Sequence, residues 1–185
     1  LKMIIGIFNK EYEKKYSKEL LRNIDDNFHI WDVGSNKGIY TKKFLKVNNV
    51  NSVVAFEPTP HLCKLLKSKF SIAIKNKRLS ICKYALADKS KKTFFWISKK
   101  NNSVENSLTY HQDTIRIAVD QFKGDDLVTK KKFKVPNLIK VDIEGGELKF
   151  LEGSKKILKY KTLKHLFIEI HFTKLNKLYG MNSVS

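Results

Sequence analysis

The chain has 185 residues, 42% of them hydrophobic, and a formal net charge of +19. This length suits one domain with a complete hydrophobic core, and no apolar run reaches the roughly 18 residues that a membrane-spanning helix needs. We expect a single domain over residues 1–185, with a helical segment at 1–28 before a core at 29–172, and no membrane span.

The charge comes almost entirely from lysine, since only three of the 37 basic residues are arginine. Proteins that read phosphates and bases favour the bidentate guanidinium of arginine. We interpret the lysine excess mainly as a compositional bias on solvated faces, with an anionic partner such as nucleic acid as the less favoured alternative. Cys63 and Cys82 lack metal-type spacing and fit buried thiols, so we expect a cytoplasmic protein.

Hydrophobic spacing predicts helices and strands that alternate along the chain. Helices are predicted at 9–28, 38–47, 60–70 and 146–160. Strands are predicted at 29–33, 52–57, 78–86, 92–98, 114–119, 135–141 and 163–171, with a polar loop at 99–113 over the site. This alternation implies a mainly parallel α/β sheet with right-handed crossovers. Because 14 residues follow the last strand, we expect a C-terminally truncated or an unusually small sheet.

Residues 30–38 read IWDVGSNKG, a short apolar strand that ends in an acid and breaks into a glycine-bounded turn. A strand, a tight turn and a helix present backbone N–H groups to a nucleotide in α/β folds. Asp32 would repel a pyrophosphate but attract an ammonium group, and S-adenosylmethionine carries one beside its nucleoside. Gly34, Asn36 and Gly38 complete the pattern, because asparagine tolerates a left-handed backbone.

A second acid, Glu57, ends the strand predicted at 52–57. A carboxylate in this position can accept hydrogen bonds from both ribose hydroxyls of a nucleoside. One acid at a strand end is usually just exposed, but two acids on consecutive strands around a glycine turn are a moderately specific signal. After the next strand, Leu86 would form a wall for the adenine and Asp88 would reach its amino group; a simple turn at Asp88 is the alternative.

Residues 138–147 read LIKVDIEGGE, another strand that ends in acids and glycines. Asp142 and Glu144 would face the ligand bound at the glycine turn, because the carboxyl ends of neighbouring parallel strands border one crevice. Paired carboxylates there could orient a hydroxyl, take its proton or hold a metal. Glu147 suits the start of the following helix. The alternative interpretation is that all three acids cap that helix.

The last predicted strand contains Glu169 and ends at His171. A glutamate inside an apolar strand needs a partner if it is buried. His171 could be a base or a substrate contact, although a histidine at a strand end is more often a surface residue. The candidate catalytic residues are therefore Asp142 with Glu144, and His171 as a backup.

These motifs together resemble those of the FkbM-family S-adenosylmethionine-dependent methyltransferases. The resemblance covers about residues 29–172, and its most specific part is the Lys-x-Asp-x-Glu-Gly-x-Glu element at 140–147. It implies a Rossmann-like class I methyltransferase sheet of order 3-2-1-4-5 with an inserted β-hairpin. It also implies S-adenosylmethionine as cofactor and O-methylation of a hydroxyl on a sugar or other small molecule.

Two other functions stay open at this point. An RNA 2′-O-methyltransferase would use a lysine near the nucleophile, and Lys140 precedes Asp142, although it could equally be a lysine at the edge of the core. A non-catalytic cofactor-binding module is favoured by the short C-terminus. A divalent metal is compatible with the paired carboxylates, but no further pattern argues for one, so no metal ligand is predicted.

Overall fold

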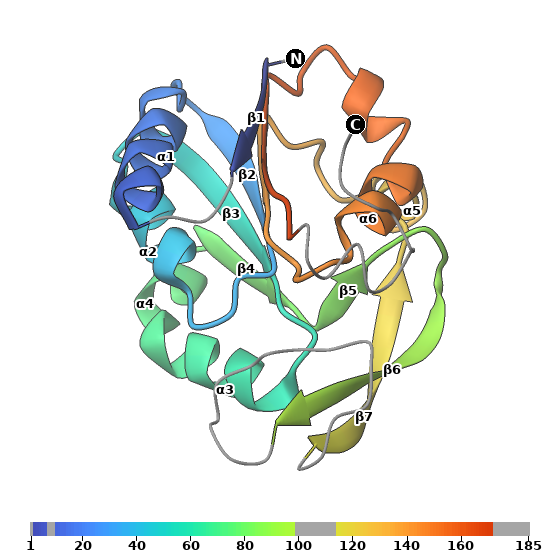
Figure 1. The fold of residues 1–185 in the computed structure, drawn as a ribbon. Coiled ribbons are helices and arrows are strands. Elements are labelled where there is room, and N and C mark those ends of the chain that lie inside the picture. Colours follow the sequence, from blue (N-terminus) through green and yellow to red (C-terminus); the bar gives the residue numbers. More distant parts are fainter. Residues whose placement is uncertain (1, 7–9, 99–113, 172–185) are drawn as a thin grey trace.

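The computed structural model describes residues 2–6, 10–98 and 114–171. The loop predicted at 99–113 and the residues after 171 lie outside this part of the chain. The described residues form a large sheet with helices on both faces and a smaller sheet at its edge (Figure 1).

Six parallel strands form the large sheet in the order β1-β9-β8-β2-β3-β4. Their bounds are β1 Lys2–Gly6, β2 Phe28–Val33, β3 Val50–Phe56, β4 Leu79–Cys82, β8 Leu138–Val141 and β9 His165–Glu169. The five strands predicted as the core follow the predicted order 3-2-1-4-5, so the expected α/β topology is confirmed. Strand β1 is an addition that the sequence analysis missed, because five residues at the chain start carry no clear flanking signal.

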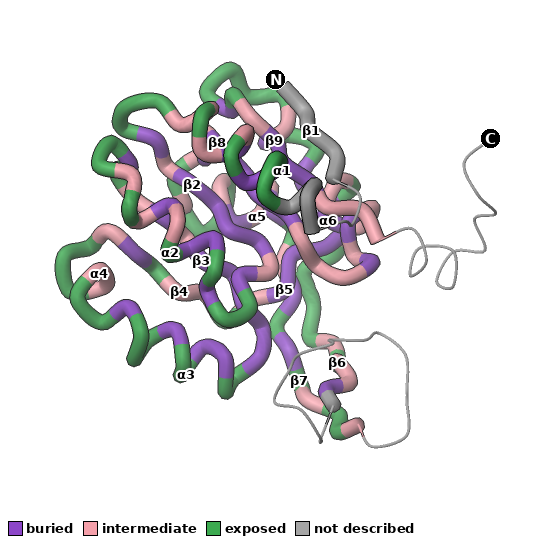
Figure 2. Tube along the Cα trace, turned by 60° about the vertical axis from the view of Figure 1, so that its left-hand side comes forward, coloured by how far each residue is buried: buried purple, intermediate pink, exposed green. Residues whose placement is uncertain are grey.

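Alternation along β2 explains why both faces of the sheet are covered. Ile30 packs into one apolar cluster with Leu20 and Phe44, whereas Trp31 packs into a second cluster with Phe150. The central strands are accordingly buried (Figure 2). The helices are α1 Lys10–Arg22, α2 Ile39–Lys46, α3 Pro60–Lys69, α4 Ser71–Lys75, α5 Gly124–Thr129, α6 Glu147–Gly153 and a 3₁₀ turn η1 Ile157–Lys159. Within the described ranges, no helix has the length and apolar character required to cross a bilayer.

Several predicted elements are wrong in extent. The helix predicted at 9–28 ends at Arg22, the strand predicted at 114–119 continues to Phe122, and the strand predicted at 135–141 begins at Leu138. The strand predicted at 78–86 is two strands, because β4 pairs with β3 in the large sheet and β5 Tyr84–Leu86 pairs with the smaller one. The helix predicted at 146–160 stops at Gly153, which packs so closely on Ala87 that a Cβ there would lie 1.9 Å from its carbonyl oxygen.

The smaller sheet has the order β5-β7-β6 and contains the predicted hairpin. Strands β6 Lys91–Ser98 and β7 Thr114–Phe122 pair antiparallel, and β5 runs parallel to β7. The inserted hairpin is thus confirmed. The smaller sheet begins with β5, which follows β4 in the chain, and it lies beside the carboxyl ends of the strands of the large sheet (Figure 1).

Candidate functional site

The turn after β2 depends on three left-handed residues. Gly34 has φ 78°, Asn36 has φ 49° and Gly38 has φ 75°, so the left-handed backbone expected for asparagine is confirmed. A Cβ on Gly34 would lie 1.9 Å from the carbonyl oxygen of Asp142, and one on Gly38 would meet Leu66 within 2.7 Å. The glycines therefore let the turn approach the end of β8 on one side and α3 on the other.

Glu57 follows β3 and is fixed beside this turn. Its side chain is almost fully buried, Oε2 accepts a hydrogen bond from the Asn36 N–H at 3.0 Å, and Oε1 accepts one from the Thr59 N–H at 2.9 Å. Burial raises the pKa of Glu57, and these hydrogen bonds oppose that rise. The acid is thus held in one orientation at the tip of the strand.

A cavity opens at the carboxyl ends of β2, β3 and β8. The glycine turn and Glu57 border one side, and Asp142 and Glu144 border another. Strands β5, β6 and β7 add an apolar and amide wall; its residues include Tyr84, Ala85, Leu86, Ala87, Phe95 and Gln121. Leu86 was predicted from the sequence, whereas Phe95 and Gln121 were not, because only the docking of the hairpin brings them to the cavity.

Three predicted cofactor residues lie outside the cavity wall: Asp32, Gly38 and Asp88. Asp32 belongs to β2 itself, and its carboxylate is fully buried between α2 and β8. Asp88 also lies outside the wall, beside the end of α6, where its Cα would be 3.3 Å from a Cβ on Gly153. The expected direct contact of these two acids with a ligand therefore has no support in the geometry.

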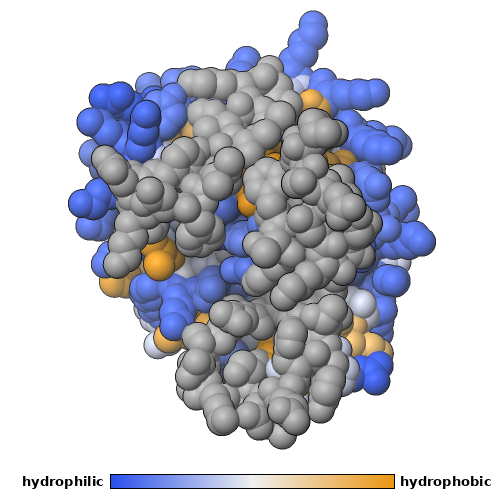
Figure 3. Space-filling model, in the orientation of Figure 1, coloured by the Kyte–Doolittle hydropathy of each residue, from blue (hydrophilic) through white to orange (hydrophobic). Residues whose placement is uncertain are grey.

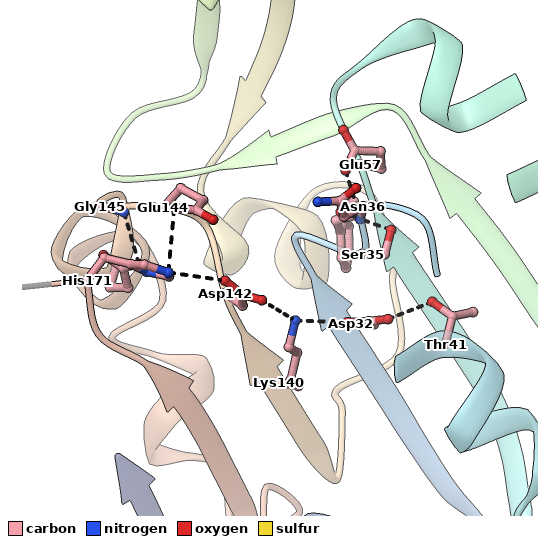
Figure 4. Close-up of polar contacts among 12 residues, drawn as sticks. Asp32, Ser35, Asn36, Thr41, Glu57, Lys140, Asp142, Glu144, Gly145 and His171 are labelled. Atoms are coloured by element: carbon pink, nitrogen blue, oxygen red, sulfur yellow. Dashed lines mark hydrogen bonds and ion pairs between the residues drawn. The ribbon is translucent and has the colours of Figure 1, made fainter. Parts of the chain in front are cut away.

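Asp32 instead takes part in a buried polar row. Thr41 Oγ1 donates a hydrogen bond to Asp32 Oδ2 at 2.6 Å, and Lys140 Nζ lies 3.8 Å from Asp32 Oδ1 (Figure 4). Asp32 and Lys140 are register partners on β2 and β8, which explains the contact. Burial raises the pKa of Asp32 although Lys140 and Thr41 oppose the rise.

Lys140 links this row to the cavity. Its side chain is 2% exposed, and Nζ donates to Asp142 Oδ2 at 3.1 Å. The carboxylates of Asp142 and Asp32 raise the pKa of Lys140 against the opposing effect of burial. The lysine is therefore an internal counter-ion beneath the cavity, which matches the interpretation of a lysine at the edge of the core.

His171 gathers three carboxylates at the other end of the row. Its Nε2 lies 3.7 Å from Asp142 Oδ1 and 3.5 Å from Glu144 Oε2, and its Nδ1 lies 2.9 Å from Glu147 Oε1. The hydrogen bond with Glu147 and the nearby carboxylates raise the pKa of His171, although burial acts in the opposite direction. The histidine is thus part of the cluster and only 10% exposed.

The acids around His171 come from three places: the segment after β8, the start of α6 and the end of β9. Strand β8 ends at Val141, so strand alternation does not extend to Asp142 and Glu144, yet both reach the cavity. Glu147 begins α6 as predicted, and its Oε1 also accepts a hydrogen bond from the Gly145 N–H at 3.0 Å. Burial and the neighbouring carboxylate of Asp142 raise the pKa of Glu169 to about 7.

Asp142, Glu144 and His171 each offer one ligand atom, and these atoms lie within 4.8 Å of one another. Such a set has the donor chemistry for a divalent cation, although acids and histidine group together without one as well.

Comparison with known proteins identifies the family of this chain. A model of the FkbM methyltransferase domain matches residues 32–181, which include every candidate site residue. The chain belongs to the FkbM methyltransferase family. This family implies S-adenosylmethionine as the methyl donor, and the cavity has a matching combination of an apolar wall and carboxylates.

A similar protein is the hexuronic acid methyltransferase AglP of Haloferax volcanii, 28% identical over 160 residues. The match covers 86% of this chain and 62% of AglP, so the chain spans less than two thirds of that relative.

Solved structures agree on the fold. An FkbM methyltransferase from Methylobacillus flagellatus KT matches with a TM-score of 0.58 and 17% identity over 83% of this chain and 38% of its own. A precorrin-6y C5,15-methyltransferase from Geobacter metallireducens GS-15 matches with a TM-score of 0.51 and 11% identity, covering 94% and 70% of the two chains.

Proposed function

We propose that the chain is an S-adenosylmethionine-dependent O-methyltransferase that acts on a hydroxyl of a sugar or another small molecule. The observation that carries the proposal is the arrangement of two sets of acids around one cavity. Glu57 is fixed beside the glycine turn, and Asp142 and Glu144 line the same cavity from the end of β8.

On this proposal the glycine turn and Glu57 bind the cofactor. The turn is shaped by Gly34, Asn36 and Gly38. Glu57 accepts hydrogen bonds from the ribose hydroxyls, and Leu86 packs against the adenine. S-adenosylmethionine supplies an activated methyl group on a sulfonium. Asp32 and Asp88 contribute from behind the cavity, since their side chains lie outside its wall: Asp32 anchors the row beneath the turn, and Asp88 supports the adenine wall.

Asp142 is the proposed proton acceptor for the hydroxyl. Lys140 donates a hydrogen bond to its Oδ2 at 3.1 Å, whereas Oδ1 makes a longer contact of 3.7 Å with His171 Nε2, so we assign Oδ1 to the acceptor hydroxyl. A positioned carboxylate that orients a hydroxyl and takes its proton supplies much of what such a transfer needs. Glu144 assists from the same wall. The raised pKa of His171 favours its charged form, so we assign it the role of balancing the two carboxylates, with proton transfer as its backup role.

The acceptor class rests on a relative. AglP is a hexuronic acid methyltransferase and is 28% identical to this chain. We therefore propose that this chain also methylates a hydroxyl of a sugar. The RNA 2′-O-methyltransferase alternative rests on the net charge and on Lys140, and the burial of Lys140 between Asp32 and Asp142 favours a structural role for this lysine. A non-catalytic binding module would bind cofactor without turnover.

The test combines cofactor binding with methyl transfer. Calorimetry should detect S-adenosylmethionine binding by the wild type, and Glu57→Ala should weaken it by about 1–3 kcal/mol, the range for lost hydrogen bonds to a charged group. Glu152→Ala, an exposed acid on α6 outside the cavity wall, is the matched control and should bind normally. Equal affinity in the wild type and Glu57→Ala would contradict the cofactor assignment.

Activity is then measured with labelled S-adenosylmethionine and a panel of hexuronic acids, neutral sugars and RNA. We expect transfer to a sugar hydroxyl. Transfer to RNA alone, or binding without transfer to any acceptor, would reject the proposed acceptor class. Addition of EDTA or Mg²⁺ separates a metal-assisted reaction from one that uses Asp142 alone.

A further inference from the structure

The net charge of the chain is concentrated in one segment. Residues 34–87 contain ten lysines and Arg78 but a single acid, Glu57. This segment is less than a third of the chain, yet its net charge of +10 is more than half of the total of +19. A compositional preference for lysine does not explain why acids, which number 18 in the chain, are missing here.

The acid in this segment does not reach the surface, because Glu57 is 2% exposed. Nine of the ten lysines are exposed, from Lys37 before α2 to Lys83 after β4. Lys69 Nζ donates to the Lys37 carbonyl at 2.7 Å and so connects the end of α3 to the start of α2. We call the exposed surface of residues 37–83 the basic face.

Large apolar side chains are exposed on the same face. Ile39 at the start of α2 is 58% exposed, Leu65 on α3 is 44% exposed, and Ile72 at the start of α4 is 75% exposed. Figure 3 shows an apolar patch bordered by hydrophilic side chains where α2 and α4 lie in Figure 1. Half of the exposed large hydrophobic residues in the described part of the chain are therefore on the basic face.

The residue types on the basic face distinguish between two kinds of anionic partner, nucleic acid and an anionic lipid surface. Nucleic-acid surfaces use arginine forks and aromatic side chains that stack on bases. The basic face has one arginine, half-buried Arg78, and its exposed large apolar residues are aliphatic. Lysines around exposed aliphatic side chains match a surface that binds anionic headgroups and inserts apolar groups at the acyl boundary.

We propose that the basic face docks the protein on an anionic lipid bilayer. Docking is peripheral: the lysines supply attraction to the headgroups, and Ile39, Leu65 and Ile72 supply apolar contact. The face borders the cavity, since Asn36 and Pro58 line the cavity and lie next to α2 and α3. A docked protein therefore holds its cavity at the membrane surface. This proposal is independent of the cofactor and acceptor assignments.

The experiment is sedimentation with phosphatidylglycerol–phosphatidylcholine vesicles and with pure phosphatidylcholine vesicles at physiological ionic strength. The wild type should bind the anionic vesicles and not the neutral ones. The variant Lys64→Glu/Lys67→Glu/Lys75→Glu should lose about a hundredfold in partitioning, because each lysine near an anionic surface contributes roughly fivefold. Calorimetry of S-adenosylmethionine binding is a separate readout, which this variant should leave unchanged.

The matched control is Lys155→Glu/Lys159→Glu/Lys161→Glu, three exposed lysines on the α6–η1 side with the same change in charge. It should lose only a few fold. Ile72→Ser should weaken binding roughly three- to tenfold through lost apolar contact, whereas Ile115→Ser on β7 should not. Circular dichroism checks that each variant is folded.

Three outcomes would overturn the proposal. In the first, the wild type does not bind anionic vesicles. In the second, the two triple variants lose vesicle binding equally. In the third, the wild type binds single-stranded RNA more tightly than vesicles, and Lys64→Glu/Lys67→Glu/Lys75→Glu loses this RNA binding. The last outcome would assign the basic face to nucleic acid.

Discussion

Asp142 is held by different partners on its two oxygens. Lys140 Nζ is 3.1 Å from Oδ2, and His171 Nε2 is 3.7 Å from Oδ1. The carboxylate is 28% exposed, so it can meet both the buried row and a ligand in the cavity. This position makes Asp142 the residue at which binding and turnover should separate.

Asp142→Asn is the first prediction at this scale. The amide keeps the size of the side chain but cannot take a proton, so affinity for S-adenosylmethionine should stay within a few fold while turnover falls by about 100-fold or more. Calorimetry and single-turnover methyl transfer measure the two effects. If affinity and turnover fell equally, Asp142 would be a cofactor or folding residue. Glu152→Gln, an exposed acid on α6, is the control.

Glu169→Gln tests the pH dependence of stability. The folded-state pKa of Glu169 is about 7, above its ordinary 4.5, so its contribution to stability is present below about 4.5 and is lost as pH rises through about 7. Glutamine mimics the protonated acid. The variant should therefore match the wild type near pH 4 and exceed its unfolding free energy by about 1–2 kcal/mol near pH 8, a value reduced for partial exposure. Urea titrations at both pH values measure this. A gain of equal size at both would show that the acid is not titrating there.

The sequence predicted some of these residues better than others. Glu57 and Asn36 were found from their positions at a strand end and in a turn, where local rules apply. The surroundings of Asp32 could not be found in this way. Its partner Lys140 is more than one hundred residues away along the chain, and only the pairing of β2 with β8 brings them together.

At the scale of elements, the turn after β2 brings two strands into close contact. Gly34→Ala should destabilise the fold by at least about 2 kcal/mol, because its φ of 78° disfavours a side chain and the new Cβ would overlap the Asp142 carbonyl. Gly146→Ala is the control: its φ is −89°, and the nearest atom, 3.2 Å away, is the flexible Cδ1 of Ile143. It should cost less than about 1 kcal/mol. Thermal unfolding measures both, and similar losses would contradict the argument.

Errors in the predicted elements have a common cause. Period-two hydrophobic spacing predicts an extended chain but does not reveal which sheet it joins, so β4 and β5 read as one strand. Helical spacing similarly continues past Gly153, where α6 ends and the chain packs closely on Ala87. These limits arise from tertiary contacts, whereas the order of the five core strands was predicted from the resemblance to the FkbM family.

At the scale of the whole molecule, the two tryptophans lie in different sheets. Trp31 is buried on β2, with its ring centroid 5.1 Å from that of Phe56, and Trp96 is on β6. We propose that the chain is one domain, as its length suggests. Trp31→Phe and Trp96→Phe each leave one reporter, and their urea midpoints by fluorescence should agree with each other and with circular dichroism. Separate transitions would show that the sheets unfold independently.

The buried row below the cavity also limits how the family can be recombined. Asp32 and Thr41 come from the first quarter of the chain, and Lys140 from the last third. A chimera that joins the first half of one relative to the second half of another would combine a carboxylate and a lysine from different ancestors. If Lys140 were replaced by an apolar residue, the Asp32 carboxylate would lose its buried counter-ion, at a cost of about 3–5 kcal/mol, whereas loss of Asp32 would leave Lys140 with Asp142. Gene-shuffling libraries should therefore retain viable crossovers between residues 41 and 140 only where both parents carry this charge pair.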